Sequence, residues 1–395
     1  MTTKIIGGTV VTGGREERAD LYYRDGVITE ISRRDLPADE VIHAEGRYVS
    51  PGFIDIHTHG AGGSDFLDGT AEAFLRAAAK QAAGGATTVV ATVTSSTCAE
   101  MERAVAVYEQ IRGRRYDGAQ IAGLHFEGPY FSPAQKGAQD EKYIKPFVRE
   151  EYERIVSSTD GVLRWSAAPE LPGAGEFAAC MRAHGVLPSI GHSDADSTRT
   201  REAFYEGFTH VTHLYSCTSS VHRRNAFRYA GIVEAAYLLD DMTVEIIADG
   251  VHLPPDLLRL VYKIKGPEHT ALVTDSMRGA GMPDGKSILG SLDNGMEVLI
   301  EDGVAKLPDR SAFAGSVALC NRLVKNMVTL ADVELAQAVR MATETPARIM
   351  RLHNKGSLIP GYDADITIFD KDFCIERTIC GGRTVYRAEK EGTPS

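Results

Sequence analysis

Two histidines at alternate positions, His57 and His59, end an apolar run that reads PGFIDIHTHG. Side chains two residues apart on a β-strand point to the same side, so this run predicts a strand that presents both imidazoles together. Imidazole is a common metal ligand, and a barrel strand would deliver the pair to the C-terminal rim, where active sites of barrels lie. Two half-buried surface histidines are the alternative, so further ligands must be found.

Other polar residues follow short apolar runs in the same way. Each of them stands where the apolar residues of its run stop, which predicts that they gather at one rim of a sheet. The candidates are Glu127 in QIAGLHFEGP, His192 in VLPSIGHSD, His213 in FTHVTHLYS, Asp249 and His252 in TVEIIADGVH, and Asp275 in TALVTDS.

Several imidazoles with a carboxylate suit a divalent transition metal, and ligand softness permits zinc, iron, manganese or cobalt. Such a metal lowers the pKa of a bound water and polarises a substrate carbonyl. These properties predict hydrolysis of an amide or ester. A neighbouring carboxylate would pass the proton of the water to the leaving nitrogen, and Asp275 is the candidate for that role.

Eight strand-like runs follow one another along the middle of the chain. Six are quoted above, and the others are GATTVVATVTS (85–95) and LRWSAAPE (163–170). Stretches with helical spacing, such as AEAFLRAAAKQAA and EEYERIVSS, separate most of them. This alternation predicts an α/β fold, a (β/α)8 TIM-type barrel. The later stretches SVALCNRLVKNMVTL and ELAQAVRMATETPARIM are predicted to be closing helices.

The two ends of the chain differ from its middle, because short β-type runs alternate there with Gly and Asp. Neither end is long enough to bury much core alone. We therefore expect residues 1–50 and 356–395 to pair into one small β-sandwich domain, and residues 51–355 to form the barrel, with breaks near Pro51 and Lys355.

Composition is that of an enzyme with a large core. The chain has 395 residues, 43% of them hydrophobic, and a formal net charge of -11, which disfavours a nucleic-acid surface. No apolar stretch of membrane-spanning length occurs and the N-terminus lacks the pattern of a signal peptide, so we expect a cytoplasmic protein with no membrane partner. The six cysteines lack C-x-x-C spacing and are expected to be reduced thiols.

The ordered set of HxH, Glu, His, His and Asp resembles the amidohydrolase superfamily. Within it, LHFEGPY, GHSDAD, THLY, ADGVH, VTDSM and FAGS are similar to the N-acetylglucosamine-6-phosphate deacetylases. The resemblance covers nearly the whole chain. It implies a hydrolase that removes acetate from a phosphorylated amino sugar in amino-sugar catabolism, with one or two divalent metal ions (zinc, iron, manganese or cobalt).

The resemblance also implies roles for single residues. Glu127, His192 and His213 match the principal metal ligands, His57 and His59 match ligands of a second ion that only some members bind, and Asp275 matches the catalytic acid and base, which also faces the metal. Residues that match the substrate-contacting segments of the family are Ala138, Gln139, Ser216, Cys217, Asp249, His252, Phe313, Ala314 and Gly315.

Two departures concern the substrate. Gln139 stands where some relatives have a histidine that polarises the acetyl carbonyl; glutamine can donate a hydrogen bond but cannot carry charge. The loop after His213 reads THLYSCTSSVHRRNAFRYAG in place of the usual family text. Arg224 falls where relatives have an arginine that reaches the phosphate in the neighbouring subunit, with Arg223 and Arg228 nearby, which implies a homodimer.

Alternatives remain open at this point. The substrate could be another N-acetylhexosamine, such as N-acetylgalactosamine 6-phosphate, or a different amide, and a barrel without activity could serve as a binding or scaffold protein. His252 could be structural, and the arginine cluster could pair with acidic residues. His125 is expected to be packed or to support a metal ligand, and not to bind metal itself.

Overall fold

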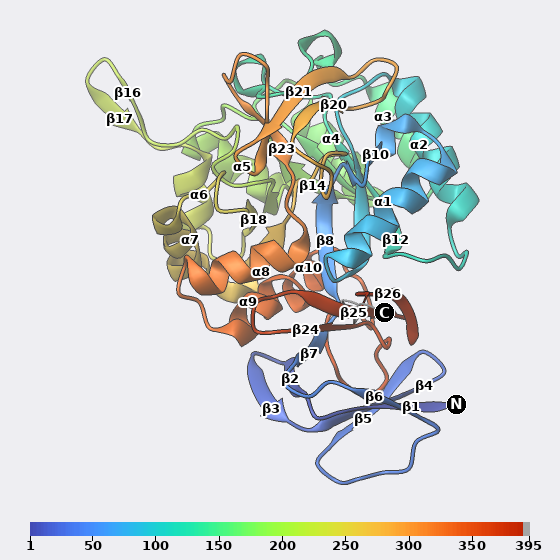
Figure 1. Cartoon of the computed structure of the whole chain (residues 1–395). Helices are drawn as coiled ribbons and strands as arrows, with labels where there is room; N and C mark the ends of the chain where they lie inside the picture. Colours follow the sequence, from blue (N-terminus) through green and yellow to red (C-terminus); the bar gives the residue numbers. More distant parts are fainter. Residues whose placement is uncertain (390–395) are drawn as a thin grey trace.

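The computed structural model describes residues 1–389, and its centre is an eight-stranded parallel sheet curved into a nearly closed barrel (Figure 1). The strands lie in the sheet in the order in which they occur in the chain, as a (β/α)8 barrel requires. They are β8 (Phe53–Thr58), β11 (Ala86–Val93), β12 (Gln120–Glu127), β13 (Val162–Ala167), β14 (Leu187–Ile190), β15 (His210–Val211), β18 (Thr243–Ile247) and β19 (Thr270–Val273).

The first and last strands meet at their C-terminal ends. The backbone N–H of Asp275 donates to the carbonyl of His57 at 2.8 Å, and Thr58 and Ser276 form an isolated parallel bridge. Every residue of β8 and of β11 is buried, as expected for strands of a parallel sheet that is covered on both faces. The predicted barrel is confirmed.

Helices cover the outside of the barrel (Figure 1). The stretch predicted from its spacing at 71–83 is α1, which begins after Thr70, whose hydroxyl accepts the N–H of Ala73. The helices are α1 (Ala71–Ala83), α2 (Cys98–Ile111), α3 (Arg149–Ser158), α4 (Ala174–Ala183), α5 (Ser197–Glu206), α6 (Ile232–Leu238), α7 (Pro255–His269), α8 (Cys320–Thr329), α9 (Leu335–Met341) and α10 (Glu344–Ile349), with 3-10 turns η1 (Phe66–Asp68), η2 (Pro133–Gln135) and η3 (Glu141–Tyr143).

The second predicted closing helix is in fact two helices, α9 and α10, with a break at Ala342–Thr343. A continuous helix would need an N–H at Pro346 to bond the carbonyl of Ala342, and proline has none. The carbonyl of Ala342 instead accepts the N–H of Ile54 in the first barrel strand, at 2.8 Å. The break therefore attaches the closing helices to the barrel.

The two ends of the chain together form a small β-sandwich below the barrel in Figure 1. Strand β24 from the C-terminal part pairs antiparallel with β7 from the N-terminal part, and a separate apolar core lies between the two sheets. One sheet has β1 (Thr2–Ile6), β4 (Asp20–Arg24), β5 (Val27–Ser32) and β6 (Glu40–His43); the other has β2 (Thr9–Thr12), β3 (Arg15–Arg18), β7 (Tyr48–Pro51), β24 (Ile366–Phe369), β25 (Ile375–Cys380) and β26 (Arg383–Arg387).

Three further antiparallel units lie outside both domains' main sheets, and sequence analysis did not predict them. A four-stranded sheet follows β19, and two hairpins follow β8 and β15. They are β20 (Gly285–Leu289) to β23 (Phe313–Ser316), with β21 (Met296–Glu301) and β22 (Val304–Lys306) between; β9 (Gly60–Ala61) with β10 (Ser64–Asp65); and β16 (His222–Arg224) with β17 (Phe227–Tyr229).

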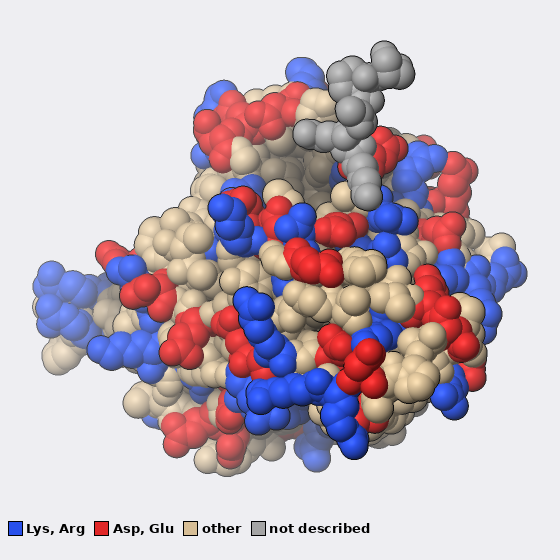
Figure 2. Space-filling model, turned by 60° about the horizontal axis from the view of Figure 1, so that its bottom comes forward, with Lys and Arg blue, Asp and Glu red and all other residues tan. Residues whose placement is uncertain are grey.

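The surface carries charges of both signs. Figure 2 shows Lys and Arg interspersed with Asp and Glu across the face that includes the underside of the molecule. Among residues 1–389, no helix combines the length and the apolar character that crossing a membrane requires.

Candidate metal centre and substrate pocket

Polar residues from five barrel strands meet at the C-terminal rim. His57 lies in β8 with His59 just beyond it, Glu127 ends β12, and His192, His213 and Asp275 each stand two residues after β14, β15 and β19. The backbone is left-handed at three of them, with φ of 46° at His192, 29° at His213 and 46° at Asp275. Such conformations are unfavourable outside glycine and concentrate at functional sites, where the surrounding structure enforces them.

Glu127, His192 and His213 form a compact buried group. Oε1 of Glu127 lies 2.9 Å from Nε2 of His213 and 3.2 Å from Nε2 of His192. The two Nε2 atoms are 3.2 Å apart. Two imidazole nitrogens and a carboxylate oxygen that converge in this way offer three lone pairs to one point, and a cation is the partner that would satisfy all of them.

His57, His59 and Asp275 form a second group beside the first. Oδ1 of Asp275 lies 3.1 Å from Nε2 of His59 and 3.4 Å from Nε2 of His57. Glu127 joins the two groups, because its Oε2 lies 3.3 Å from Nε2 of His59. Nε2 of His57 is buried without a hydrogen-bond partner, as a nitrogen that ligates a cation would be. The donor atoms of each group therefore fit a divalent ion.

All the candidate ligands except His57 share a pocket with most of the residues expected to contact substrate. Ala138, Gln139, Ser216, Cys217, His252, Phe313 and Gly315 line this pocket together with His59, Glu127, His192, His213 and Asp275. Thr94, Tyr215, Ile247 and Leu289 also line it, and sequence analysis did not single them out. A pocket with a group of metal ligands at one side and polar and apolar walls suits a small polar substrate with a scissile bond at the ligands.

The model of the amidohydrolase family matches residues 48–385. This chain belongs to the amidohydrolase family. The matched residues include the barrel and every metal-ligand candidate. The name of the family denotes the hydrolysis of amides, which agrees with the chemistry expected of these ligands.

Several relatives of this amidohydrolase have names that describe an activity. It is 32% identical over 381 residues to N-acetylglucosamine-6-phosphate deacetylase of Lysinibacillus sphaericus, covering 95% of each chain. It is 35% identical over 342 residues to the Vibrio furnissii protein of the same name, covering 86% of this chain and 83% of that one. N-acetylgalactosamine-6-phosphate deacetylase of Escherichia coli O157:H7 is 31% identical over 359 residues, with 90% and 92% covered.

Solved structures agree with the amidohydrolase fold. An N-acetyl-D-glucosamine-6-phosphate deacetylase variant from Mycobacterium smegmatis, solved with N-acetyl-D-glucosamine 6-phosphate, matches with a TM-score of 0.88 at 30% identity and covers 98% of this chain and 99% of that one. The Thermotoga maritima deacetylase matches with a TM-score of 0.86 at 28% identity, covering 98% and 100%.

Three of the expected substrate residues do not line the amidohydrolase pocket. Asp249 is buried behind it, where its carboxylate accepts the backbone N–H and the Nδ1 of His252, each at 2.8 Å, and so orients that imidazole. Ala314 is buried beside Gly315 in β23. Arg224 lies on the exposed β16–β17 hairpin, which projects away from the barrel in Figure 1, and its guanidinium stands 5.6 Å from the ring centroid of Tyr229.

A buried ion pair that no sequence motif predicted lies beneath the site. Oε1 of Glu245 in β18 accepts from Nδ1 of His57 at 2.6 Å, and its carboxylate also pairs with the guanidinium of Arg164 in β13. Because the carboxylate accepts the Nδ1 proton, the lone pair of His57 is left on Nε2, which faces Asp275. The only signal in the sequence was one charged residue inside each of the otherwise apolar runs LRWSA and TVEII, which marks the two residues but not their pairing.

His125 has a packing role here, as expected. It is buried between two hydroxyl groups, with Nε2 2.7 Å from Oγ of Ser166 and Nδ1 3.1 Å from Oγ1 of Thr92. Both ring nitrogens thus have partners, and burial lowers the pKa of His125 well below its ordinary value. A neutral imidazole with both nitrogens engaged has none left for a metal.

The electrostatics of the site keep its carboxylates ionised. Burial opposes ionisation of Glu127, but His57 and the hydrogen-bonded His192 and His213 outweigh burial and hold the pKa of that carboxyl well below its usual range. Burial likewise opposes ionisation of Asp275, and His57 and His59 lower its pKa. Ionised carboxylates are what a metal ligand and a proton acceptor both require.

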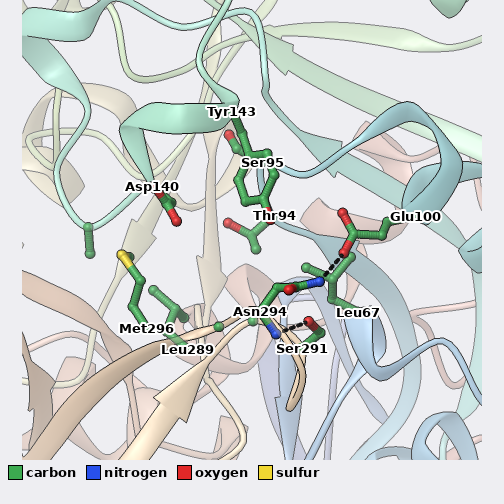
Figure 3. Close-up of a pocket in the computed structure, with 13 residues that line it drawn as sticks. Leu67, Thr94, Ser95, Glu100, Asp140, Tyr143, Leu289, Ser291, Asn294 and Met296 are labelled. Carbon is green, nitrogen blue, oxygen red and sulfur yellow. Dashed lines mark hydrogen bonds between the residues drawn. The ribbon is translucent and has the colours of Figure 1, made fainter.

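A second pocket adjoins the first, with Thr94, Ala138 and Leu289 common to both (Figure 3). Its acidic side chains already have partners within the fold. Glu100 accepts from the backbone and hydroxyl of Thr97 and from Nδ2 of Asn294, and Asp140 accepts from the backbone of Lys142. None of the metal-ligand candidates lines this second pocket, whereas all of them except the fully buried His57 line the first.

Proposed function

We propose that this amidohydrolase removes acetate from N-acetylglucosamine 6-phosphate, giving glucosamine 6-phosphate and acetate. The observation that carries the proposal is the convergence of Glu127, His192 and His213 on one point beside Asp275, inside a pocket that the matched substrate segments line. Relatives that bear this activity in their names are similar over nearly the whole chain, which supports the choice of substrate.

In this proposal Glu127, His192 and His213 hold a divalent transition metal, and His57, His59 and Asp275 are the ligand set for a second ion. When bound, such an ion acidifies a water molecule and polarises an amide carbonyl. The remaining chemistry belongs to the side chains of the pocket.

Asp275 takes a proton from the attacking water and returns it to the departing amine. Its pKa is lowered by His57 and His59 despite burial, so it is ready to accept a proton, and its position after β19 aims it at the pocket. His252, which Asp249 orients, and the amide of Gln139 are hydrogen-bonding groups for the sugar and the acetyl carbonyl. Neither needs to change its charge in this role.

Arg224 serves the phosphate of a neighbouring subunit's substrate in this proposal. Arg224 lies on an exposed hairpin and does not line the pocket of its own subunit, which supports a homodimer with shared sites. A cytoplasmic location stays a prediction from the sequence.

Acetate release tests the proposal. Purified protein loaded with a divalent metal should release acetate from N-acetylglucosamine 6-phosphate, and Asp275→Asn should lower kcat by at least about 10³-fold, because general acid–base catalysis contributes about that much. Asp284→Asn, at an exposed aspartate outside the pocket, is the matched control and should keep full activity. Full activity of Asp275→Asn, with native circular dichroism, contradicts the assigned mechanism.

N-acetylgalactosamine 6-phosphate is the second candidate substrate. The named E. coli relative is 31% identical to this chain, close to the values for the N-acetylglucosamine-6-phosphate enzymes. The ratio of kcat/KM for the two sugar phosphates decides between them. If kcat/KM is higher for N-acetylgalactosamine 6-phosphate, that sugar phosphate is the substrate, and the roles assigned to the site residues are unchanged.

A further inference from the structure

Gln139 makes a set of contacts that involves both ends of its side-chain amide. Its Oε1 accepts the hydroxyl proton of Thr94 at 2.8 Å and the backbone N–H of Ser95 at 3.1 Å. Its Nε2 donates to Oε2 of Glu127 at 2.8 Å. The side chains of Thr94, Gln139 and Glu127 are all buried, so water offers little compensation for a hydrogen bond that is lost among them.

These contacts permit only one orientation of the amide. If the amide were flipped, its oxygen would face the ionised carboxylate of Glu127 and its NH2 group would face the N–H of Ser95. Both contacts would be repulsive, because a carboxylate only accepts and a backbone N–H only donates. The N–H of Ser95 and the carboxylate of Glu127 therefore determine that Gln139 presents its donor to Glu127. The hydroxyl of Thr94, which Figure 3 labels with Ser95 at the wall of the adjoining pocket, adds a second donor that holds the amide oxygen in this orientation.

The donor in turn restrains the carboxylate of Glu127. A hydrogen bond on Oε2 restrains rotation of the carboxylate while Oε1 faces Nε2 of both His192 and His213. Groups that bond to the far oxygen of a carboxylate ligand orient it and tune its affinity for metal. Thr94 thus lies two hydrogen bonds away from the converging lone pairs.

We infer that Thr94 is a positioning residue of the metal centre and acts through the amide of Gln139. The inference rests on the metal centre of the proposed function and deepens it, because it assigns a task to a side chain that no motif singled out. The hydroxyl at position 94 is the second donor to the oxygen of Gln139 and, with the N–H of Ser95, limits the movement of the amide that contacts Glu127.

Zinc titration of the metal-free protein against a chromophoric chelator, without substrate, tests the inference. The variants are Thr94→Val, which is close in shape but has no hydroxyl, Thr94→Ser, which restores it, and Gln139→Met. Thr88→Val is the matched control, because Thr88 is a fully buried threonine of the same strand region whose hydroxyl has no hydrogen-bond partner. Thermal unfolding of each metal-free variant reports whether the fold is intact.

The wild type should bind zinc, and Thr94→Val should bind it about tenfold more weakly, the lower end of the range for groups that orient a ligand. Thr94→Ser and Thr88→Val should match the wild type. In a Gln139→Met background, Thr94→Val should have no further effect, since the partner through which it acts is gone. Unchanged zinc affinity in Thr94→Val overturns the inference. So does a loss of zinc affinity that also occurs in Thr94→Ser, or one that Thr94→Val causes equally in the wild type and in the Gln139→Met background.

Failure of the proposed function is distinguishable from failure of this inference. A wild type that binds zinc with the expected pattern of variants but releases no acetate keeps the inference and removes the assigned substrate. A wild type that binds no zinc overturns both.

Discussion

At the scale of single residues, the polar groups at the ends of the apolar runs were predictable, whereas single charged residues inside those runs were not. Glu127, His192, His213 and Asp275 each stand where an apolar run stops, and parallel strands bring such positions to one rim. Glu245 was not predicted, because one charge inside an apolar run has no partner visible in the sequence. Its partners Arg164 and His57 come from β13 and β8, which are distant in the chain.

Glu245 leads to a prediction about pH. Burial opposes its ionisation, but Arg164 and His57 hold the pKa of Glu245 well below its usual range, so the unfolded chain binds this proton more readily than the folded one. The stabilisation is present above the unfolded pKa of about 4.3 and is lost as pH falls. Removal of this charge leaves Arg164 buried and unpaired at neutral pH.

We therefore expect Glu245→Gln to destabilise the metal-free protein by about 3–5 kcal/mol at pH 7, with the difference from wild type shrinking below about pH 4. Chemical unfolding in the presence of a chelator, at a series of pH values, measures this difference. Glu202→Gln, at an exposed position, is the control and should show almost no change. A difference that stays constant with pH would exclude an ionised Glu245 in the fold.

At the scale of elements, the barrel and its first helix could be predicted because each depends on a local pattern. Strand β11 is an apolar run and α1 has helical spacing after a threonine cap. The sheet β20–β23 could not be predicted, because its strands are short and partly exposed and derive their stability from pairing with one another. The break between α9 and α10 depends on a proline and on a contact with Ile54.

Helix α6 supplies a prediction of its own. Nζ of Lys265, from α7, donates to the carbonyls of Ala236 and Asp240 at 3.1 Å each and of Leu239 at 2.8 Å, which caps the C-terminus of α6. Burial lowers the pKa of this lysine, yet its ammonium satisfies three acceptors. Lys265→Met should cost about 1–3 kcal/mol of stability, because the carbonyls lose their donor.

The thermal unfolding midpoint measures the effect of Lys265→Met. Lys263→Met is the matched control, since Lys263 lies on the same helix but is exposed. Equal midpoints for the two variants would show that Lys265 is not needed as a cap.

At the scale of the whole molecule, the sequence predicted a barrel with a β-sandwich made from both ends, and the fold confirms that architecture. The domain boundaries near Pro51 and Lys355 stay a prediction. The homodimer also stays a prediction, and the observation that supports it is the exposed hairpin that carries Arg224.

A mixing experiment tests the dimer and the shared site together. Arg224→Ala should lack the phosphate contact, and Asp275→Asn should lack the acid and base, so each alone should be nearly inactive. In a mixed dimer, one site receives Arg224 from one subunit and Asp275 from the other. After subunit exchange, an equal mixture should recover about a quarter of wild-type activity, since half of the dimers are mixed and one site in each is intact. Recovery of no activity despite exchange contradicts the shared site.

The proposed chemistry requires that Glu127, His192 and His213 share one cation. Anomalous diffraction at the zinc absorption edge, from crystals of the zinc-loaded protein, locates that ion directly. We expect a strong peak within ligand distance of Oε1 of Glu127 and of Nε2 of both histidines. A peak elsewhere in the protein, with these three side chains in place and without an ion between them, would contradict it.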